Sequence, residues 1–214
     1  MLQRYGVRQA IVHLLALVFL SSATPAVARD LLVVALGDSL TAGYGLPPGQ
    51  GFAPRLEATL RAQRVPARVY NAGVSGDTAA AGKARLGWVL RALKAKPDLV
   101  IVEFGGNDIL RGIRPAQTRA NLDAIVADLK RRNIRVVIAG MLASPNMGPR
   151  YSATFNPIYP QLARKYGAAL YPFFMRGVAG RRELVLKDGV HPNAAGVNVI
   201  VRGIAPVVRR ALGR

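Results

Sequence analysis

The sequence predicts an α/β protein in which a parallel sheet carries helices on both faces. Five short apolar segments alternate with segments of helical periodicity, and three of these apolar segments end in loops rich in Gly, Ser or Asn. Right-handed crossovers between parallel strands leave few other topologies. The chain has 214 residues, of which 51% are hydrophobic, and this is enough for the core of one domain. We find no internal repeat and no linker to a second domain.

Unbroken apolar runs mark the predicted strands. Residues 31–36 read LLVVAL, with β-branched Val33 and Val34 and no alternating polar positions. This pattern is typical of a strand that is covered on both faces, as in a parallel sheet. The five predicted strands are 31–36, 67–71, 99–104, 135–140 and 168–171.

Helical periodicity occupies the segments between the strands. The clearest helix starts at Pro115, because its apolar positions recur at the spacing that places them on one face. The last helix runs from an N-cap at Asn193 to about Leu212, and Pro206 is expected to kink or interrupt it. Further helices are predicted at 52–64, 78–93 and 154–166, and Pro157 and Pro160 are expected to shorten or bend the last of these. Residues 141–151 are expected to form an irregular loop that could line a pocket. Residues 172–187 show no clear pattern.

The first 28 residues have the pattern of a secretory signal rather than of a folded domain. Arg4 and Arg8 give a positive start, residues 11–20 are almost wholly apolar, and the segment ending at Ala28 supplies a small-x-small cleavage site. The apolar run is too short to span a bilayer. We therefore predict a signal peptide at 1–28, cleavage after Ala28, and a periplasmic or secreted domain at 29–214.

The predicted domain is strongly basic. The formal charge of the chain is +19, and it becomes +17 when Arg4 and Arg8 leave with the signal peptide. Such a charge favours anionic partners, and an anionic phospholipid surface is the one that we consider. Aromatic residues are few and are not interleaved with the basic clusters, so the stacking surfaces of single-strand nucleic-acid binders are missing. We predict no nucleic-acid partner.

Cysteine and histidine are scarce enough to limit the possible chemistry. The chain has no cysteine, so neither disulfides nor a catalytic thiolate are available. His191 is the only histidine after residue 28, and a zinc site of the usual histidine type needs more ligands than this. Any catalysis by an imidazole base must therefore use His191, and we predict that no metal or cofactor takes part.

Ser39 is the candidate nucleophile. It follows the first predicted strand in the segment GDSL, and open α/β sheets bind their ligands at the carboxyl ends of the strands. Taken alone, a serine at this position is more simply explained as a helix cap or a turn residue. The remaining chain has to decide between the two explanations.

Asp188 and His191 precede the last predicted helix and complete a candidate triad. Pro192 keeps His191 out of helical dihedrals, and Gly189 allows the backbone to bend so that the carboxylate can reach the imidazole. A carboxylate on one ring nitrogen fixes the tautomer and stabilises the imidazolium that forms during proton transfer. A histidine that merely caps the final helix is the alternative, and this segment alone leaves it open.

Two further loops offer donors for an oxyanion. Gly76 presents a backbone N–H without side-chain obstruction, and Asn107 presents a side-chain amide. Each is also an ordinary turn residue. Their joint occurrence with Ser39 and the Asp188–His191 pair, after three successive strands and before the last helix, favours one site at one edge of the sheet.

Four sequence blocks carry a resemblance to a known family. The chain contains GDSL at 37–40, a glycine at 76, GGND at 105–108 and D-x-x-H-P at 188–192, in that order. It is thereby similar to the SGNH, or GDSL, hydrolases along essentially the whole predicted domain. The resemblance implies a flavodoxin-like, three-layer α/β/α sandwich around a five-stranded parallel sheet. It also implies that Ser39 is the nucleophile and that Asp188 and His191 complete its triad. The oxyanion hole would then consist of the Ser39 N–H, Gly76 and Asn107.

The same resemblance sets expectations for the substrate. We expect Asp38, Asp108, Ile109 and Leu110 to contact it, and we expect a monomer that acts on a small acyl ester or thioester. Ile109 departs from the family pattern, in which glycine is expected. The mobility of the loop at 109–114 and the preferred acyl length are therefore open.

We predict a serine esterase or thioesterase that forms an acyl-enzyme on Ser39 and cleaves lysophospholipids, aryl esters or acyl thioesters. An α/β-hydrolase would need a G-x-S-x-G elbow, and the nearest sequence, around Ser75, fails at its last position. A carbohydrate O-deacetylase with the same four blocks is the alternative enzyme. A non-catalytic binder of anionic surfaces that keeps the fold is the alternative from a different class.

Overall fold

Five strands form one fully parallel sheet in the order β2-β1-β3-β4-β5. The computed structural model describes residues 29–214, so the predicted signal peptide lies outside the described residues. The predicted five-stranded parallel sheet is confirmed. The strands are β1 (Leu31–Gly37), β2 (Ala67–Gly73), β3 (Leu99–Glu103), β4 (Arg135–Ala139) and β5 (Ala169–Tyr171).

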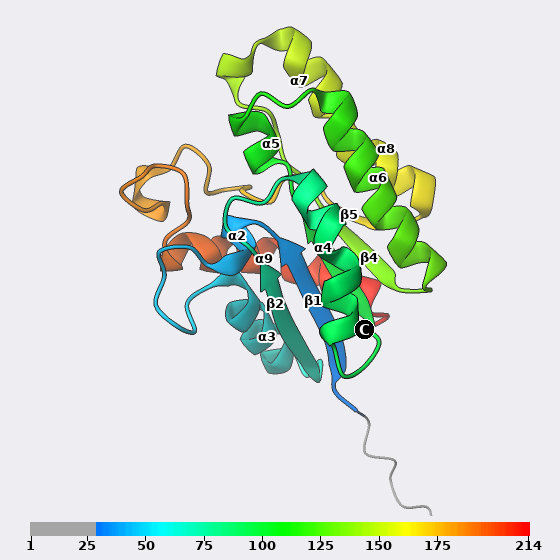
Figure 1. Ribbon diagram of the computed structural model, residues 1–214. Helices are drawn as coiled ribbons and strands as arrows, with labels where there is room; N and C mark the ends of the chain where they lie inside the picture. The colour runs from blue at the N-terminus through cyan, green and yellow to red at the C-terminus, as the bar shows by residue number, and fades with distance from the viewer. Residues whose placement is uncertain (1–28) are drawn as a thin grey trace, which may run out of the picture.

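Helices cover both faces of this sheet. They are α2 (Ser39–Ala42), α3 (Phe52–Ala62), α4 (Ala79–Ala92), α5 (Gly106–Leu110), α6 (Pro115–Arg131), α7 (Pro149–Phe155), α8 (Ile158–Tyr166) and α9 (Ala194–Ala211), with 3-10 turns η1 (Pro145–Met147) and η2 (Arg182–Leu184). Helices α3 and α9 pack together on one face, and α4, α6 and α8 form the layer on the other (Figure 1). The predicted three-layer sandwich is therefore confirmed. Within residues 29–214, no helix is long and apolar enough to cross a membrane.

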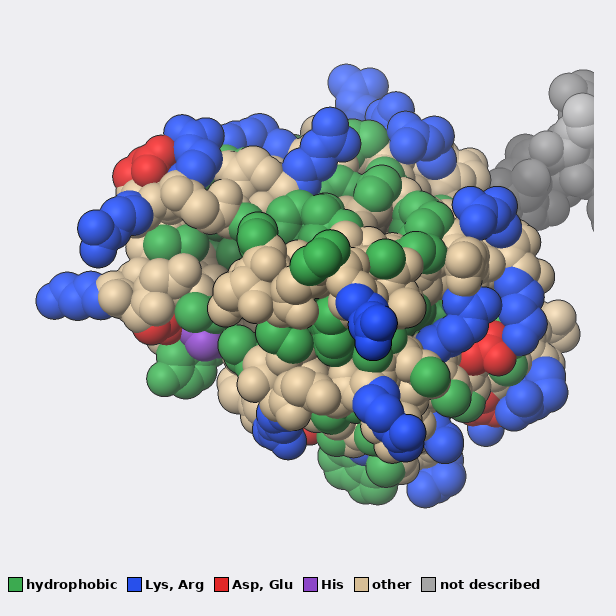
Figure 2. All heavy atoms as spheres, turned by 90° about the horizontal axis from the view of Figure 1, so that it is seen from above, with side chains coloured by type: hydrophobic (Ala, Val, Ile, Leu, Met, Phe, Trp, Pro, Cys, Tyr) green, Lys and Arg blue, Asp and Glu red, His purple; other side chains and the backbone are tan. Residues whose placement is uncertain are grey.

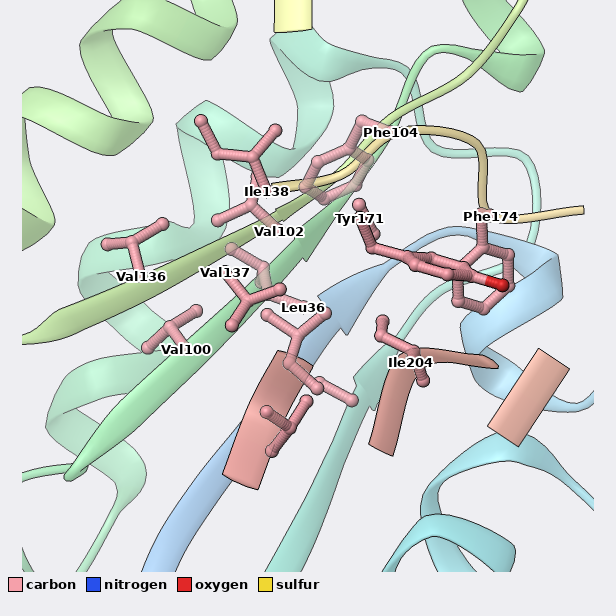
Figure 3. Packing of buried hydrophobic residues seen from close by; sticks show 14 of the residues in the cluster. Leu36, Val100, Val102, Phe104, Val136, Val137, Ile138, Tyr171, Phe174 and Ile204 are labelled. Carbon is pink, nitrogen blue, oxygen red and sulfur yellow. The ribbon is translucent and has the colours of Figure 1, made fainter. Parts of the chain in front are cut away.

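The core lies between the sheet and its two helical layers, which explains the unbroken apolar strands. Leu36 of β1 lies beside Val102 of β3 in the parallel register, and both are buried. Figure 3 shows such strand side chains together with Tyr171 and with Ile204 of α9. Gly203 lets α9 approach the sheet, because a Cβ at this position would lie 2.2 Å from the Tyr171 hydroxyl oxygen. Close packing of this helix matters for the site, since the turn before it carries His191.

The predicted helix at 154–166 is two helices in the structure. The first, α7, ends at Phe155, and α8 begins at Ile158. Pro157 has no N–H to continue the hydrogen bonds of α7, so the chain breaks there rather than bending. Because α7 starts earlier than expected, the predicted irregular loop at 141–151 is also shorter.

Two other expectations need correction. The predicted loop at 105–108 contains the start of α5, which places Asn107 in a helical turn. Pro206 does not interrupt α9, which runs on to Ala211. Proline leaves the carbonyl of Arg202 without its helical donor, but both residues are exposed, so water can bind that carbonyl.

Candidate active site

A cavity of about 340 Å³ opens at the carboxyl ends of the strands. Every segment that follows β1, β2, β3 and β4 contributes to its lining, and so does the turn before α9. Figure 2 shows this end of the molecule, where hydrophobic side chains gather in the middle of the face and Lys and Arg side chains lie around them. Of the five predicted catalytic and oxyanion residues, four line this one cavity: Ser39, Gly76, Asn107 and His191.

Ser39 is the first residue of α2, and Asp38 alone separates it from the end of β1. Asp38, not Ser39, caps this short helix, because its Oδ1 accepts a hydrogen bond from Leu40 N at 2.9 Å. The capping role that competed with a nucleophilic role thus belongs to the neighbouring residue. Gly73 at the end of β2 allows the turn to pack closely, since a Cβ there would lie 2.3 Å from Ala42 N.

His191 joins the Ser39 hydroxyl to the Asp188 carboxylate. Its Nε2 lies 2.9 Å from Ser39 Oγ, and its Nδ1 lies 2.7 Å from Asp188 Oδ2. Because a carboxylate only accepts hydrogen bonds, Nδ1 carries the proton and Nε2 is left to accept the hydroxyl proton. Asp188 Oδ1 accepts from the N–H groups of His191 and Val190, and these bonds, followed by the bond to the ring, lower the pKa of Asp188 to about 2. The carboxylate is therefore ionised throughout the neutral range.

The turn that carries His191 is fixed from both sides. Leu186 N donates to His191 O at 2.7 Å, and Val185 pairs with Pro192 in an isolated antiparallel bridge. Asn193 then caps α9 by accepting a hydrogen bond from its first turn. His191 is therefore not the cap of the last helix, which was the alternative that its sequence segment left open.

The candidate oxyanion donors differ in how they are already bonded. The backbone N–H groups of Ser39 and Gly76 have no acceptor among residues 29–214. Asn107 Nδ2 donates to Asp38 Oδ2 at 3.1 Å and to Asp77 O at 3.0 Å. Both partners are acceptors, so they fix which end of the amide is nitrogen. A substrate oxygen must therefore share an Asn107 N–H with one of these partners.

Two arginines hold the loop that carries Gly76. Arg111 Nη2 donates to Gly76 O at 2.7 Å. Arg85 donates from Nε to Asp77 at 2.5 Å and from Nη2 to Gly37 O at 2.9 Å, so it ties the end of β1 to the loop after β2. Our sequence reasoning missed both residues, because single arginines in a very basic chain carry no distinguishing signal.

The four predicted substrate contacts separate into two groups. Asp38, Ile109 and Leu110 line the cavity. Asp108 is not part of the lining: its carboxylate accepts from Ala79 N at 2.9 Å and from Thr118 Oγ1 at 2.8 Å, and so it holds α4 and α6 together. Its burial is explained by these bonds rather than by contact with a substrate.

The apolar wall of the cavity was predicted only in part by the sequence reasoning. Met141 and Leu142 come from the predicted pocket-lining loop, but Met175 comes from the segment without a clear pattern. The Tyr44 ring lies beside the imidazole in a tilted arrangement, with 4.5 Å between the two ring centres and 38° between the ring planes. The proximity of Tyr44 to GDSL was the only signal that pointed to it.

Fold and site together define a class of enzyme. A hydroxyl bonded to an imidazole that a carboxylate orients, beside backbone N–H donors, is the arrangement of a serine hydrolase. Among the described residues, no group of three His, Asp or Glu side chains is placed to hold a metal ion. The chain belongs to the GDSL-like lipase/acylhydrolase family, whose sequence model matches residues 35–199. The family resemblance predicted from the four blocks is confirmed.

Known relatives agree on the type of reaction. The chain is similar to Esterase TesA of Pseudomonas aeruginosa, with 39% identity over 198 residues that cover 92% of this chain and 96% of that one. It is also similar to Thioesterase 1/protease 1/lysophospholipase L1 of Escherichia coli strain K12, with 39% identity over 168 residues and 78% of each chain covered. The crystal structure of AlinE4, a SGNH-hydrolase family esterase, is 49% identical, with a TM-score of 0.74 and coverage of 86% of this chain and 97% of that one. The protein is an enzyme that hydrolyses ester bonds.

Proposed function

We propose that Ser39, His191 and Asp188 form a catalytic triad that hydrolyses acyl esters and thioesters through an acyl-enzyme. The proposal rests on the two hydrogen bonds of 2.9 Å and 2.7 Å that connect the three side chains. His191 Nε2 takes the hydroxyl proton while Ser39 Oγ attacks the acyl carbon. The imidazolium then protonates the departing alcohol or thiol, and a water molecule releases the acyl group by the same route.

The negative charge of each tetrahedral intermediate develops on the acyl oxygen. The N–H groups of Ser39 and Gly76 make no hydrogen bond within residues 29–214, so no bond has to break before they donate to it, and Asn107 contributes a shared N–H. Preformed donors of this kind stabilise the transition state because they are already oriented before the charge appears. Arg111 supports this arrangement by holding the carbonyl of Gly76.

The lining of the cavity favours an acyl chain over a sugar. Tyr44, Leu110, Met141 and Leu142 offer apolar surface beside the hydroxyl. A volume of about 340 Å³ lies near the lower end of the roughly 300–1,000 Å³ that is usual for small-molecule sites, and this favours short and medium acyl groups. We therefore favour monoacyl lipids, aryl esters and acyl thioesters as substrates over carbohydrate acetates.

The assignment is tested with a series of nitrophenyl esters and acyl thioesters of increasing chain length. We expect hydrolysis of medium chains, loss of kcat by roughly 10³-fold or more in Ser39→Ala, and labelling of Ser39 alone by a fluorophosphonate. Ser75, the competing serine, also lines the cavity, so labelling of Ser75 would assign the role of nucleophile to Ser75 instead of Ser39. Activity on acetyl esters alone would favour the deacetylase, and wild-type activity in Ser39→Ala would refute the triad.

We also propose that the face around the cavity associates with anionic phospholipid. Tyr44, Leu110, Leu142 and Val190 line the cavity and are also exposed, with Leu110 73% exposed. The basic side chains around this face (Figure 2) would attract an anionic surface, while the apolar residues would enter its outer layer.

Vesicle sedimentation tests this association. We expect binding to anionic vesicles that weakens with salt, and weaker binding of Leu110→Asp. Trp88→Asp is the matched control, because Trp88 is 64% exposed but is not part of the cavity lining. Equal binding of both variants, or binding that is indifferent to lipid charge, would contradict the proposal.

We further propose that the enzyme acts outside the cytoplasm as a monomer. The sequence of residues 1–28 supports export. Arg29, the first residue after the predicted cleavage site, already belongs to the fold through hydrogen bonds of 2.7 and 2.8 Å to Asp98. Mass spectrometry of the mature N-terminus and light scattering of the purified enzyme test the two statements.

A further inference from the structure

A carboxyl group that the proposed mechanism does not use lies directly beneath the nucleophile turn. Glu103 is the last residue of β3 and is only 1% exposed. Its Oε2 accepts hydrogen bonds from Asp38 N at 3.3 Å and from Thr41 Oγ1 at 2.8 Å. Its Oε1 is buried and has no hydrogen-bond partner among residues 29–214. An ionised carboxylate in such a place is costly, so its presence calls for a function.

The nucleophile turn is shaped around this carboxyl group. Gly37, the first residue of GDSL, has no side chain where one would collide with it: a Cβ there would lie 2.6 Å from Glu103 Oε2 and 2.2 Å from Thr41 Oγ1. The carboxyl therefore fills the space that Gly37 leaves. Ser39 lies between Asp38 and Thr41, the two residues that donate to Glu103, so the carboxyl determines how the turn is seated.

Asp38 extends this arrangement to the oxyanion site. While its N–H binds Glu103, its side-chain Oδ1 accepts from Leu40 N at 2.9 Å and its Oδ2 accepts from Asn107 Nδ2 at 3.1 Å. Glu103, Asp38 and Asn107 thus form a chain of contacts from the interior to a donor for the substrate. An ionised Asp38 holds the Asn107 amide more strongly than a neutral one, because charged acceptors make stronger hydrogen bonds.

Two buried carboxyl groups side by side cannot both be ionised at low cost. Burial, and then the charge of Asp38, raise the pKa of Glu103 well above its ordinary value, and burial raises the pKa of Asp38 to about 6. The other titratable groups that face this pair are Tyr159 of α8, Arg85 of α4 and His191. Of the two groups, Asp38 therefore gives up its proton more readily, and its charge then favours the protonated form of Glu103.

We propose that Glu103 is a positioning residue which acts as a neutral carboxylic acid, seating the nucleophile turn through Asp38 N and Thr41 and keeping Asp38 available as the anion that orients Asn107. This inference rests on the proposed function of Ser39 and Asn107. It gives Glu103 no contact with the substrate. Its effect should appear in kcat, because the groups that it positions act on the transition state.

Substitutions at Glu103 separate shape from charge. Glu103→Gln is neutral and keeps an oxygen that can accept from Asp38 N and Thr41, so we expect kcat at pH 8 to stay within about threefold of wild type. Glu103→Leu removes the acceptor, and we expect kcat to fall roughly 10- to 100-fold with little change in KM, less than for direct loss of an oxyanion donor. A loss above 100-fold in Glu103→Gln would show that the negative charge is needed, and wild-type kcat in folded Glu103→Leu would remove the positioning role.

Infrared difference spectra test the protonation state without relying on activity. At pH 8 we expect the carbonyl band of a protonated carboxylic acid in the wild type, lost in Glu103→Gln and kept in Asp38→Asn. Absence of the band in the wild type, or its loss only in Asp38→Asn, would overturn the assignment of the proton to Glu103. Failure of the triad itself would instead appear as activity in Ser39→Ala, so the two failures are distinguishable.

Discussion

Replacing Asp188 by Asn tests the triad with almost no change in side-chain size. The carboxylate accepts two backbone N–H groups at Oδ1, from Val190 and His191, and binds His191 Nδ1 at Oδ2. An amide cannot make all three bonds. If its oxygen keeps the backbone bonds, its NH2 faces Nδ1, and the ring proton must move to Nε2. The imidazole is then unable to accept the Ser39 proton.

The opposite amide orientation keeps the tautomer but points NH2 at the two backbone N–H groups, which forfeits two hydrogen bonds of about 1 kcal/mol each. The two losses together favour the wrong tautomer. A triad in the wrong tautomer loses roughly 10⁴-fold in kcat, equal to about 5 kcal/mol in the activation barrier.

Initial rates of nitrophenyl ester hydrolysis at pH 8 measure this loss, and thermal unfolding followed by circular dichroism shows whether the variant is folded. Asp123→Asn is the matched control, because Asp123 pairs with Lys165 on an exposed surface away from the cavity, and it should stay within twofold of wild type. A folded Asp188→Asn enzyme with kcat within tenfold of wild type would refute the role of Asp188.

Two further predictions concern stability. Gly82→Ala should lower the free energy of unfolding by about 1–3 kcal/mol, because its Cβ would lie 2.2 Å from the Phe104 ring. Gly87→Ala in the same helix meets only the flexible end of Arg91, at 3.3 Å, and should raise the free energy of unfolding by up to about 1 kcal/mol. Urea unfolding of both variants measures this, and the reverse order would contradict it. The pKa of Asp38 is raised to about 6 in the folded state, against an ordinary value of 3.8, so the folded state binds the Asp38 proton more tightly than the unfolded state does. Protonation of Asp38 therefore adds to the free energy of unfolding. This stabilisation is complete below about pH 4 and is lost as the pH rises through about 6. The melting temperature of Asp38→Asn relative to wild type should therefore increase from pH 4 to pH 7, and a constant difference would argue against the shift.

The sequence predicted those elements whose signal is local. β1 was predicted because a strand that is buried on both faces is an unbroken apolar run. α6 was predicted because a helix that is buried on one face repeats its apolar residues at helical spacing. α5 was not, since Gly105 to Asp108 have turn propensities and the helix is held instead by Asp108 contacts with α4 and α6. The break between α7 and α8 depends on a single missing N–H at Pro157. The sequence indicated that this proline shortens or bends a helix at 154–166, but it did not show that two helices meet there.

The same distinction applies to the site. Ser39, Asp188 and His191 could be proposed from the sequence because their side-chain chemistry and their order along the chain are restrictive even before folding. Glu103 lies within the predicted strand 99–104 and was given no role, because that role depends on the space that Gly37 and Thr41 leave around its carboxyl group. Contacts of this kind arise between segments far apart in the chain and leave no periodic signal.

The hydrogen bond between Ser39 and His191 joins residues 152 positions apart. The proposed nucleophile and the candidate oxyanion donors come from the first half of the chain, whereas the proposed base lies in the turn that precedes α9. Contacts that close such long loops are slow to form, and domains emerge from the ribosome with their N-terminal segments first. A nascent or truncated chain that ends before residue 191 therefore carries the proposed nucleophile without its proposed base. With the proposed triad, we expect hydrolytic activity only once the turn at residue 191 lies against Ser39, so recovery of ester hydrolysis after dilution from denaturant should report the formation of this contact.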